Sequence, residues 1–403
     1  MTVQDKYLFK LVRLMLIISG LWPLEIPNAS KNWQVIFKVY YVVAHMIYLT
    51  SPFAFGGALL VDYGVRNAQA AEDFSRMVFV ILIVFKLNII RSQKIKNIIN
   101  LVTSEEINIM KSTDKHVKST YEAHVAYCTK MVFFIVVFLW AAGLTNMFNG
   151  FYELNKWNQM TQFSVANETT FKPHIIPFWF PFNKEKHFIL AMAYQIWHIY
   201  QTLAINSAIL ALINSVMVFL RANLKILQYH IRHFDSVNAY DIDDGVESRY
   251  FPEKNLKRLI LRHQLLIKWV HDLDDSFKSI LLLEYCVTSI QLATTLIQII
   301  QLVHIPFNGT FFMHCLLQLF GIAWNANEIL LESSTGLLEA LYNSNWFNRN
   351  KEISYLIYFM MIRCKRPLVM RIGPFGNMNL NAAISRVKLA YTCLSVLKVT
   401  TEE

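Results

Sequence analysis

Apolar stretches long enough to cross a membrane recur from one end of the chain to the other. A bilayer core of about 30 Å requires roughly 20 apolar residues in a helix. Hydrophobic residues make up 55% of the 403 residues and charged residues only 16%, a balance that excludes an ordinary soluble domain. The sequence therefore predicts an all-α membrane protein with seven transmembrane helices. The seven stretches are residues 35–60, 73–92, 126–150, 187–220, 276–303, 309–332 and 379–400.

Two further apolar segments are too short or too interrupted to cross a bilayer. The segment ISYLIYFMMI at 353–362 is followed by RCKR, so we expect a short cytoplasmic helix before the last span. Near the amino terminus, Lys6, Lys10 and Arg13 precede an apolar run that Pro23 interrupts, and no small-residue cleavage site follows. This pattern favours an amphipathic helix in the membrane interface over a signal peptide.

The distribution of Lys and Arg predicts the orientation of the spans, because basic residues near span ends stay on the cytoplasmic side. The loops on the amino-terminal side contain 25 Lys and Arg residues, whereas the alternate loops contain 6. We therefore expect a cytoplasmic amino terminus and, with an odd number of spans, an extracellular carboxyl terminus. The net charge of +10 is spread over these loops instead of forming one patch, which argues against nucleic acid as a partner.

Two N-glycosylation sequons agree with this orientation. Asn167-Glu168-Thr169 and Asn308-Gly309-Thr310 both fall in predicted outer loops, which glycosylation can reach. Asn308 is close to the predicted bilayer surface, so Asn167 is the expected glycosylation site.

The residues that carry chemistry in enzymes and metalloproteins are not grouped in this sequence. It contains no Gly-rich phosphate loop, HExxH or GxSxG motif, and its five cysteines are scattered singly. The intramembrane ionisable residues Lys86, Lys130, His198 and Glu284 do not cluster in the sequence. We expect no enzyme activity, no metal and no cofactor. The inverted orientation and the lack of Asp/Glu-Arg-Tyr and Asn-Pro-x-x-Tyr motifs argue against a G-protein-coupled receptor.

The last predicted span has a polar side. Asn381, Ser385, Lys388, Thr392 and Ser395 recur at steps of three and four residues, so they lie within a sector of roughly 80° at 100° per residue. In a bilayer, such a stripe must face protein or water. Ser and Thr pack against neighbouring helices in many membrane bundles, but the lysine favours water. If several subunits shared this stripe, it would line a pore that ends in more apolar residues.

The carboxyl-terminal segment from Leu338 to Lys398 closely resembles the signature of insect odorant receptors. The resemblance lies in Tyr342, Trp346, the stretch MIRCKRP at 361–367, and Gly373. In the last span it includes Ser385, Lys388, Tyr391, Val396, Leu397 and Lys398, and at the amino terminus it includes GLWP at 20–23. Chain length, span count and inverted orientation extend the likeness to the whole chain.

This resemblance implies a subunit of a tetrameric, ligand-gated, nonselective cation channel in the plasma membrane of olfactory sensory neurons. The partner would be the odorant receptor co-receptor, and the ligand a small volatile odorant. The loop between the fourth and fifth spans lacks the long insertion of the co-receptor, so the chain resembles a ligand-tuning subunit. The last helix would line the pore for conducted cations, with Val396 and Thr400 at the position of the gate.

The resemblance also divides the chain, which we expect to be a single domain over residues 1–403. Residues 1–32 would form a cytoplasmic or interfacial amino terminus, and 33–332 would form six spans with a ligand pocket in their outer half. A cytoplasmic anchor segment would follow at 333–378. The pore helix and an extracellular tail would occupy 379–403.

No motif marks the ligand pocket, so its residues are predicted from the faces of the spans. A volatile ligand requires a mostly apolar cavity with one or two polar groups. Gly143 would make room, the methionines would tolerate varied shapes, and Tyr200 and Gln318 would orient a carbonyl or hydroxyl group. The predicted ligand-binding residues are Phe74, Met77, Val78, Ile81, Trp140, Gly143, Leu144, Met147, Met192, Ile196, Tyr200, Gln318 and Phe320.

Two alternatives remain open at this point. A gustatory receptor would have the same architecture, but its usual terminal pattern of Thr-Tyr and Gln-Phe is missing. A membrane transporter would show discontinuous spans and two halves in pseudo-repeat, and neither is found.

Overall fold

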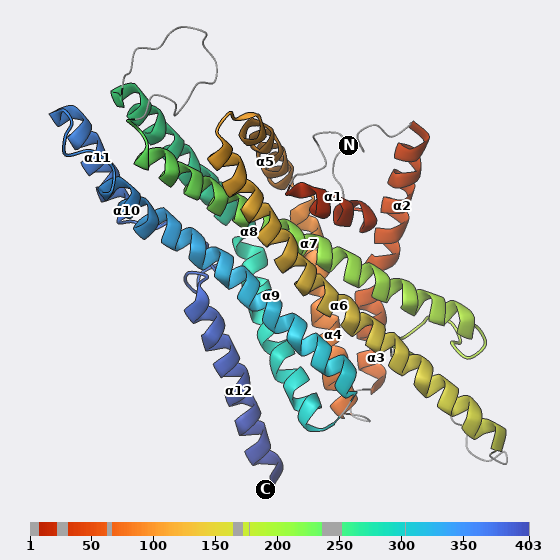
Figure 1. Cartoon of the computed structure of the whole chain (residues 1–403). Helices are drawn as coiled ribbons and strands as arrows, with labels where there is room; N and C mark the ends of the chain where they lie inside the picture. The colour runs from red at the N-terminus through yellow and green to blue at the C-terminus, as the bar shows by residue number, and fades with distance from the viewer. Residues whose placement is uncertain are drawn as a thin grey trace.

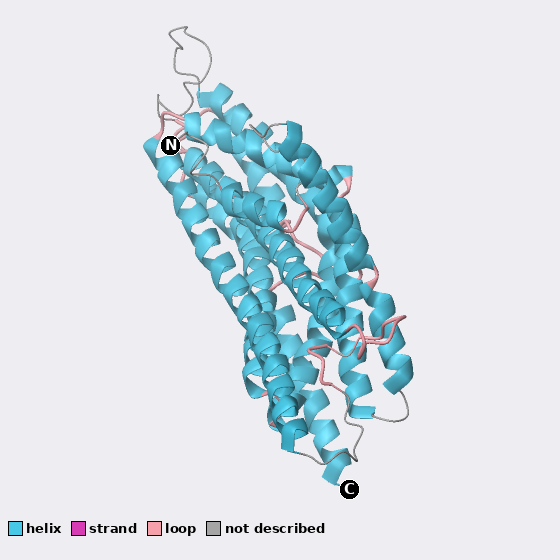
Figure 2. Cartoon of the chain, turned by 90° about the vertical axis from the view of Figure 1, so that its right-hand side faces the viewer, coloured by secondary structure: helices cyan, strands magenta, loops and turns pink. Residues whose placement is uncertain are grey.

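The computed structural model describes residues 8–21, 31–62, 67–163, 172–176, 178–235, 252–302 and 304–402. Within these ranges the chain is helical, and its β-structure is limited to one isolated bridge. The long helices run side by side in one elongated bundle (Figure 1, Figure 2). The helices are α1 (Phe9–Ile18), α2 (Lys31–Leu49), α3 (Ser51–Asp62), α4 (Asn67–Ile90), α5 (Gln93–Lys111), α6 (Lys115–Phe163), α7 (Phe188–Arg232), α8 (Pro252–Ile300), α9 (Ile305–Leu331), η2 (Glu332–Gly336), α10 (Leu337–Tyr342), α11 (Lys351–Cys364) and α12 (Leu380–Glu402).

Helices lie at all seven predicted spans, so the predicted all-α class is confirmed. The second and seventh spans correspond to α4 and α12, which have 24 and 23 residues and reach about 35 Å at 1.5 Å per residue. Among the described residues, five helical segments are long and apolar enough to cross a membrane. They are Lys31–Val61, Lys115–Met160, Phe188–Arg232, Pro252–Ile300 and Ile305–Tyr342.

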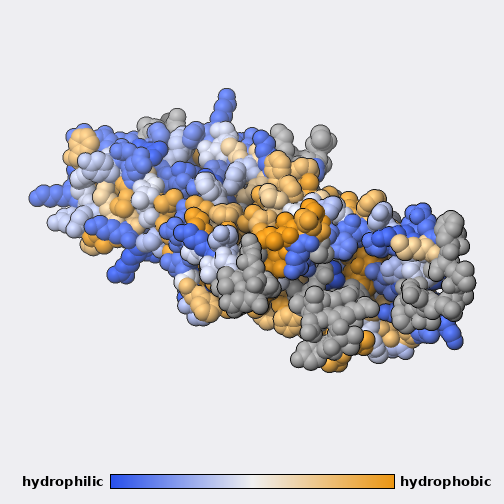
Figure 3. All heavy atoms as spheres, turned by 90° about the horizontal axis from the view of Figure 1, so that it is seen from below, coloured by the Kyte–Doolittle hydropathy of each residue, from blue (hydrophilic) through white to orange (hydrophobic). Residues whose placement is uncertain are grey.

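The surface of the bundle has an apolar middle. Seen from below, orange apolar side chains gather over the centre of the molecule, and blue hydrophilic side chains gather towards its two ends (Figure 3). Phe53, Leu60, Phe133, Phe134 and Phe148 are among the large apolar side chains that remain exposed. Water would disfavour such a belt, whereas lipid chains would cover it.

Three helices extend well beyond the predicted spans. The helices α6, α7 and α8 contain 49, 45 and 49 residues, and each reaches about 70 Å, more than twice the thickness of a bilayer core. Of the three corresponding predicted spans, 187–220 is the longest and already exceeds the roughly 20 residues that a bilayer needs. Apolar length underestimates a helix that continues as an amphipathic helix outside the membrane, because the hydropathy falls there while the helical hydrogen bonds continue.

The first predicted span consists of two helices. The helix α2 ends at Leu49, and α3 begins two residues later with Pro52 in its first turn. Proline lacks the N–H group that an interior helical position requires, but the first turn of a helix tolerates it. The Thr50 hydroxyl between the helices donates to the Ile47 carbonyl oxygen at 2.6 Å.

The helix α7 forms the centre of the bundle. Every residue from Leu203 to Leu220 is buried, and α7 packs against α1, α6, α8 and α9. Small residues such as Ala204, Ala208 and Ala211 allow the surrounding helices to approach closely. A helix that is apolar on all sides can be buried on all sides, as α7 is.

One end of the bundle carries the shorter helices and the turn before α12. The sixth span continues through the π-helical turn η2 into α10, where the sequence predicts the start of a cytoplasmic segment. The short helix predicted at 353–362 is present as α11. Residues 370–378 then form a tight hairpin, in which the Met378 N–H donates to the Met370 carbonyl oxygen at 2.7 Å. The carboxyl end of α12 lies at the opposite end of the bundle (Figure 1).

The hairpin is fastened to α8 by one arginine. The Arg371 guanidinium and backbone N–H both donate to the Asp274 carboxylate, with the backbone N–H at 2.6 Å from Oδ1. Gly373 has a φ of +50°, and a Cβ at this position would lie 2.8 Å from Leu282 of α8. Glycine is therefore required both by the turn and by the close approach of the hairpin to α8.

A buried carboxyl group holds α1 in place. Glu106 of α5 is 1% exposed, and its Oε1 accepts hydrogen bonds from the Leu8 N–H at 2.8 Å and the Tyr121 hydroxyl at 2.6 Å. Burial raises the pKa of Glu106 to about 7, although these two hydrogen bonds oppose the rise. The face of α1 that contains Val12 and Leu16 packs on the bundle, in line with the predicted amphipathic helix.

Candidate functional site

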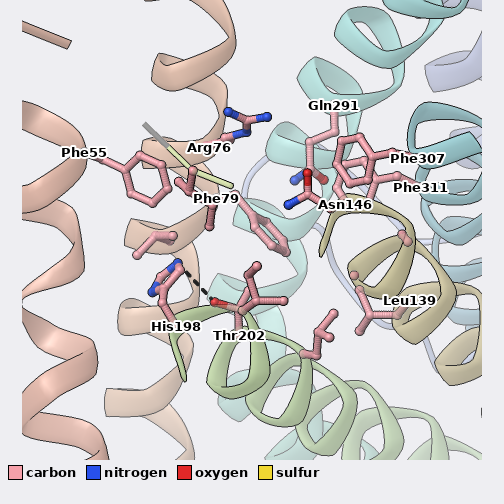
Figure 4. A pocket seen from close by; sticks show the side chains of 16 residues that line it. Phe55, Arg76, Phe79, Leu139, Asn146, His198, Thr202, Gln291, Phe307 and Phe311 are labelled. Atoms are coloured by element: carbon pink, nitrogen blue, oxygen red, sulfur yellow. Dashed lines mark hydrogen bonds between the residues drawn. The ribbon is translucent and has the colours of Figure 1, made fainter. Parts of the chain in front are cut away.

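A cavity of about 130 Å³ lies inside the bundle. Its lining residues on α7 and α9 lie near the first residues of these helices, which are at the end of the bundle opposite to α11 (Figure 1). Its lining residues come from six helices and one loop position, and their side chains point towards a common space (Figure 4). The volume is comparable to that of an apolar cavity of about 150 Å³ that holds a benzene ring. The lining residues are Phe55 of α3, Arg76, Phe79 and Val80 of α4, Leu139, Ala142, Gly143 and Asn146 of α6, Ile176 of the segment before α7, His198, Ile199, Thr202 and Leu203 of α7, Gln291 of α8, and Phe307 and Phe311 of α9.

Aromatic rings form much of the cavity wall. The ring centroids of Phe79 and Phe311 are 6.2 Å apart in an edge-to-face arrangement, and those of Phe307 and Phe311 are 5.7 Å apart and stacked. Phe307 and Phe311 are four residues apart, so both point from one face of α9. Such a wall favours a small apolar or aromatic molecule.

A few polar groups interrupt the apolar lining. Figure 4 shows Arg76, Asn146 and Gln291 on the side away from His198 and Thr202. The Thr202 hydroxyl lies 3.4 Å from His198 Nε2 and also 3.4 Å from the hydroxyl of Tyr48. A ligand with a single hydroxyl or carbonyl group could therefore be oriented from either end of the cavity.

Gly143 has a steric role at the contact between α6 and α7. A Cβ at this position would lie 2.4 Å from Leu203 Cδ1, well inside van der Waals contact. Leu203 also lines the cavity, so the missing side chain lets Leu203 lie against α6 instead of extending further into the cavity.

Of the predicted ligand-binding residues, Gly143 lines the cavity and the others lie elsewhere. Phe74, Ile81 and Leu144 are exposed on the outside of the bundle, and Met192 and Gln318 are buried. Trp140 donates from its indole N–H to the Ser207 hydroxyl at 3.1 Å and packs edge to face on Tyr200. The remaining predicted residues, Met77, Val78, Met147, Ile196 and Phe320, are partly buried.

Most of the lining residues are not among those predicted from the sequence. On α4, the predicted face is opposite to the face of Arg76, Phe79 and Val80 that lines the cavity. One usable signal was present, because polar residues inside apolar spans usually face protein or a cavity. His198 and Thr202, four residues apart on α7, follow that rule.

Two ionisable residues that are far apart in the sequence lie together in the core. The Lys86 ammonium group of α4 forms an ion pair with the Glu284 carboxylate of α8, and both residues are buried. His198 lines the cavity, and Lys130 is exposed. Within the described part of the chain, no group of three His, Cys, Asp or Glu side chains could hold a metal ion.

The polar stripe of α12 faces away from the rest of the bundle. Asn381, Ser385, Lys388, Thr392 and Ser395 are exposed, whereas Ala383 and Ala390, on the opposite side of the helix, are buried against α8 and α9. The three hydroxyl groups donate to carbonyl oxygens of α12 itself, at 2.8–3.0 Å.

The predicted gate residues Val396 and Thr400 lie on the helical backbone of α12, but their side chains fall outside the described structure, as does the whole of Asn167. Asn308 belongs to α9 and is buried, so its sequon is not in a loop.

The fold and the cavity define a helical membrane protein that can hold a small apolar molecule inside its bundle. A family model described as "7tm Odorant receptor" matches residues 66–391. The chain therefore belongs to the insect odorant receptor family, and the predicted resemblance is confirmed. This is a family of receptors and not of enzymes, as the sequence analysis predicts.

Curated relatives come from two insects. The chain is 28% identical over 146 residues to odorant receptor Or2 of Anopheles gambiae, a match that covers 36% of this chain and 38% of that relative. It is 20% identical over 249 residues to odorant receptor 22b of Drosophila melanogaster, with 59% of this chain and 60% of that relative covered. The matched stretches thus span less than two thirds of these relatives.

A solved structure shares the fold over nearly the whole chain. The olfactory receptor OR5 of Machilis hrabei superposes with a TM-score of 0.79 and 16% identity, and covers 96% of this chain and 97% of that one. The structure of the same receptor in complex with eugenol superposes with a TM-score of 0.77 and 15% identity, over 97% of both chains. At this identity, the likeness establishes the fold alone.

Proposed function

We propose that the chain is the ligand-binding subunit of an odorant-gated, nonselective cation channel. It would act in the plasma membrane of olfactory sensory neurons, with its amino terminus on the cytoplasmic side. Its partner would be the odorant receptor co-receptor, in a complex that we expect to be a tetramer. The observation that carries this proposal is the aromatic cavity of about 130 Å³ inside a bundle of the odorant receptor family. The eugenol complex of a receptor with the same fold supports a volatile ligand.

The ligand would bind in the cavity and favour an open arrangement of the pore. Four phenylalanine rings offer dispersion contacts, and Arg76, Asn146, His198, Thr202 and Gln291 offer the few polar contacts that set orientation. A ligand shifts a conformational equilibrium only if it binds one state more tightly. The open state would therefore have the more complementary cavity.

The helix α12 would line the ion path. Its polar stripe is exposed in the single subunit and lies opposite the side that packs on α8 and α9. Lysine and hydroxyl groups in a membrane require protein or water, and a path shared among subunits would supply water. Val396 and Thr400 remain the predicted gate residues.

Voltage clamp of cells that express the chain with and without the co-receptor tests this function. We expect a cation current evoked by volatiles, from a panel of alcohols, esters, ketones and eugenol, only when the co-receptor is present. Robust current from the chain alone would contradict the need for a partner. A second-messenger response without any current would contradict the channel function.

A further inference from the structure

Four helices meet at a layer of polar side chains in the core of the bundle. Lys86 of α4 pairs with Glu284 of α8 and also donates to Asn206 Oδ1 of α7 at 3.1 Å. The Gln318 side-chain amide of α9 donates to Glu284 Oε1. We call these four residues the polar layer. Their exposed fractions lie between 0% and 5%, so the layer is shielded from lipid and from the bulk water outside the bundle.

Stability alone does not explain a buried ion pair. Removing two charges from water offsets most of the attraction between them, so an apolar pair of similar size is often no less stable. Ionisable residues inside membrane proteins are mostly associated with function. The cavity and α12 are the two places where this bundle would act, and two of the helices that supply the polar layer, α8 and α9, line the cavity and also pack against α12.

The polar layer lies directly beneath the cavity. Each helix that supplies one of its residues also supplies a cavity-lining residue, three to seven positions away in the sequence. This spacing corresponds to roughly 5–10 Å along a helix axis. The residues of each helix are Val80 and Lys86 on α4, Leu203 and Asn206 on α7, Gln291 and Glu284 on α8, and Phe311 and Gln318 on α9.

The helix α8 connects the polar layer to α12. Tyr285, the residue after Glu284, donates from its hydroxyl to the Ala382 carbonyl oxygen at 3.1 Å. The Arg386 guanidinium of α12 lies 3.8 Å from the centroid of the Tyr285 ring. Consecutive residues of α8 therefore hold α4 on one side and α12 on the other.

We propose that the Lys86–Glu284 ion pair is a positioning element for gating, which holds α8 against α4 beneath the cavity and thereby sets the resting position of α12. This inference rests on the proposed function. A ligand that enters between Phe79 of α4 and Gln291 of α8 separates these helices at the level of the cavity, and the ion pair resists that separation below it. Without the ion pair, the ligand-bound arrangement becomes easier to reach.

Paired substitutions separate this role from a purely structural one. Lys86→Met with Glu284→Gln removes both charges but keeps similar volumes and leaves an acceptor for Gln318. Lys86→Glu with Glu284→Lys reverses the pair and retains the attraction. The matched control is Lys257→Met with Glu253→Gln, which removes a surface ion pair of the same helix, in which Nζ lies 2.5 Å from Oε1.

Each variant is expressed with the co-receptor, and currents are normalised to the amount at the cell surface. We expect the neutral pair to raise the current in the absence of odorant, and to lower the half-maximal concentration of the most potent panel volatile by about two- to thirtyfold, the range expected of coupling residues. The reversed pair and the surface control should match the parent.

Three outcomes would overturn the inference. The first is a neutral pair whose resting current and half-maximal concentration equal those of the parent. The second is a reversed pair that behaves like the neutral pair. The third is the loss of both variants from the cell surface, which would assign the ion pair to folding alone. A parent that gives no odorant-evoked current would instead contradict the proposed function, and the resting currents of the variants would still test the ion pair.

Discussion

Gly143 has no side chain, and Leu203 extends into the space that a side chain at this position would fill. Gly143 faces the cavity from α6, and Leu203 faces it from α7. The shape of the cavity therefore depends on a contact between two helices as much as on the rings that line it. Even a small change in volume at such a contact displaces the neighbouring side chains, because protein interiors are closely packed.

Gly143→Ala should reduce the size of the cavity. The new methyl group would lie 2.4 Å from Leu203 Cδ1, so Leu203 must turn into the cavity. Such overpacking costs about 1–3 kcal/mol. Dose–response currents should show a larger loss of sensitivity for bulky volatiles than for small ones. Gly309→Ala is the control, since nothing lies within 4 Å of a Cβ placed at Gly309. An equal loss of sensitivity for all volatiles in Gly143→Ala would argue against a cavity at Gly143.

Glu106 should make the attachment of α1 depend on pH. Its pKa is raised from an ordinary value of 4.5 to about 7, mainly by burial. Between these values the folded protein keeps a proton that the unfolded chain has lost, so the free energy of unfolding falls as the pH rises from about 4.5 to 7. The total effect is at most about 3 kcal/mol.

Glu106→Gln removes this titration and keeps an oxygen that can accept from Leu8 and Tyr121. Melting temperatures of the purified protein should therefore differ little at pH 5, and the variant should be the more stable at pH 8. Parallel pH profiles for parent and variant would show that Glu106 does not titrate in this window. Glu105→Gln, at a neighbouring carboxylate that pairs with Arg262, serves as the control.

At the scale of the helices, periodicity and apolar length predict which elements exist but not which face of each points inward. The helix α4 is apolar on both the lipid side and the protein side, so Phe74 and Ile81 look as suitable for a cavity as Phe79 and Val80. In soluble proteins the polar face of a helix marks the outside, whereas in a bilayer that contrast is lost. Gly143 could be identified because a glycine in a span marks a close approach.

The pairing of side chains on different helices could not be predicted from the sequence, for a different reason. Lys86 and Glu284 look unrelated until α4 and α8 are packed together, because their pairing depends on tertiary contacts. The stripe on α12 was accessible to prediction, since it depends only on spacing within one helix. Local patterns therefore predicted which side of α12 is exposed better than they predicted which residues line the cavity.

At the scale of the whole molecule, the bundle has two different ends. The short helices α5, α10 and α11 lie at one end, and the carboxyl end of α12 lies at the other (Figure 1). The cavity is in the half towards this second end, since its lining residues on α7 and α9 lie near the first residues of these helices. The excess of basic residues in the loops at the first end predicts that it is cytoplasmic. In this arrangement the cavity would lie in the extracellular half of the bundle, and the polar stripe of α12 would cross the membrane.

Thiol accessibility in the functional complex shows whether the polar stripe of α12 faces a water-filled ion path. Cysteine is introduced at Thr392 or Ser395 on the polar stripe and, as a control, at Ala390, which is 5% exposed and packs on the bundle. A charged, membrane-impermeant thiol reagent is then applied from outside during the odorant-evoked current. We expect a progressive change of current for Thr392→Cys and Ser395→Cys and none for Ala390→Cys or the parent. Stripe positions that never react, or that react no faster than Ala390→Cys, would contradict a water-filled path along α12.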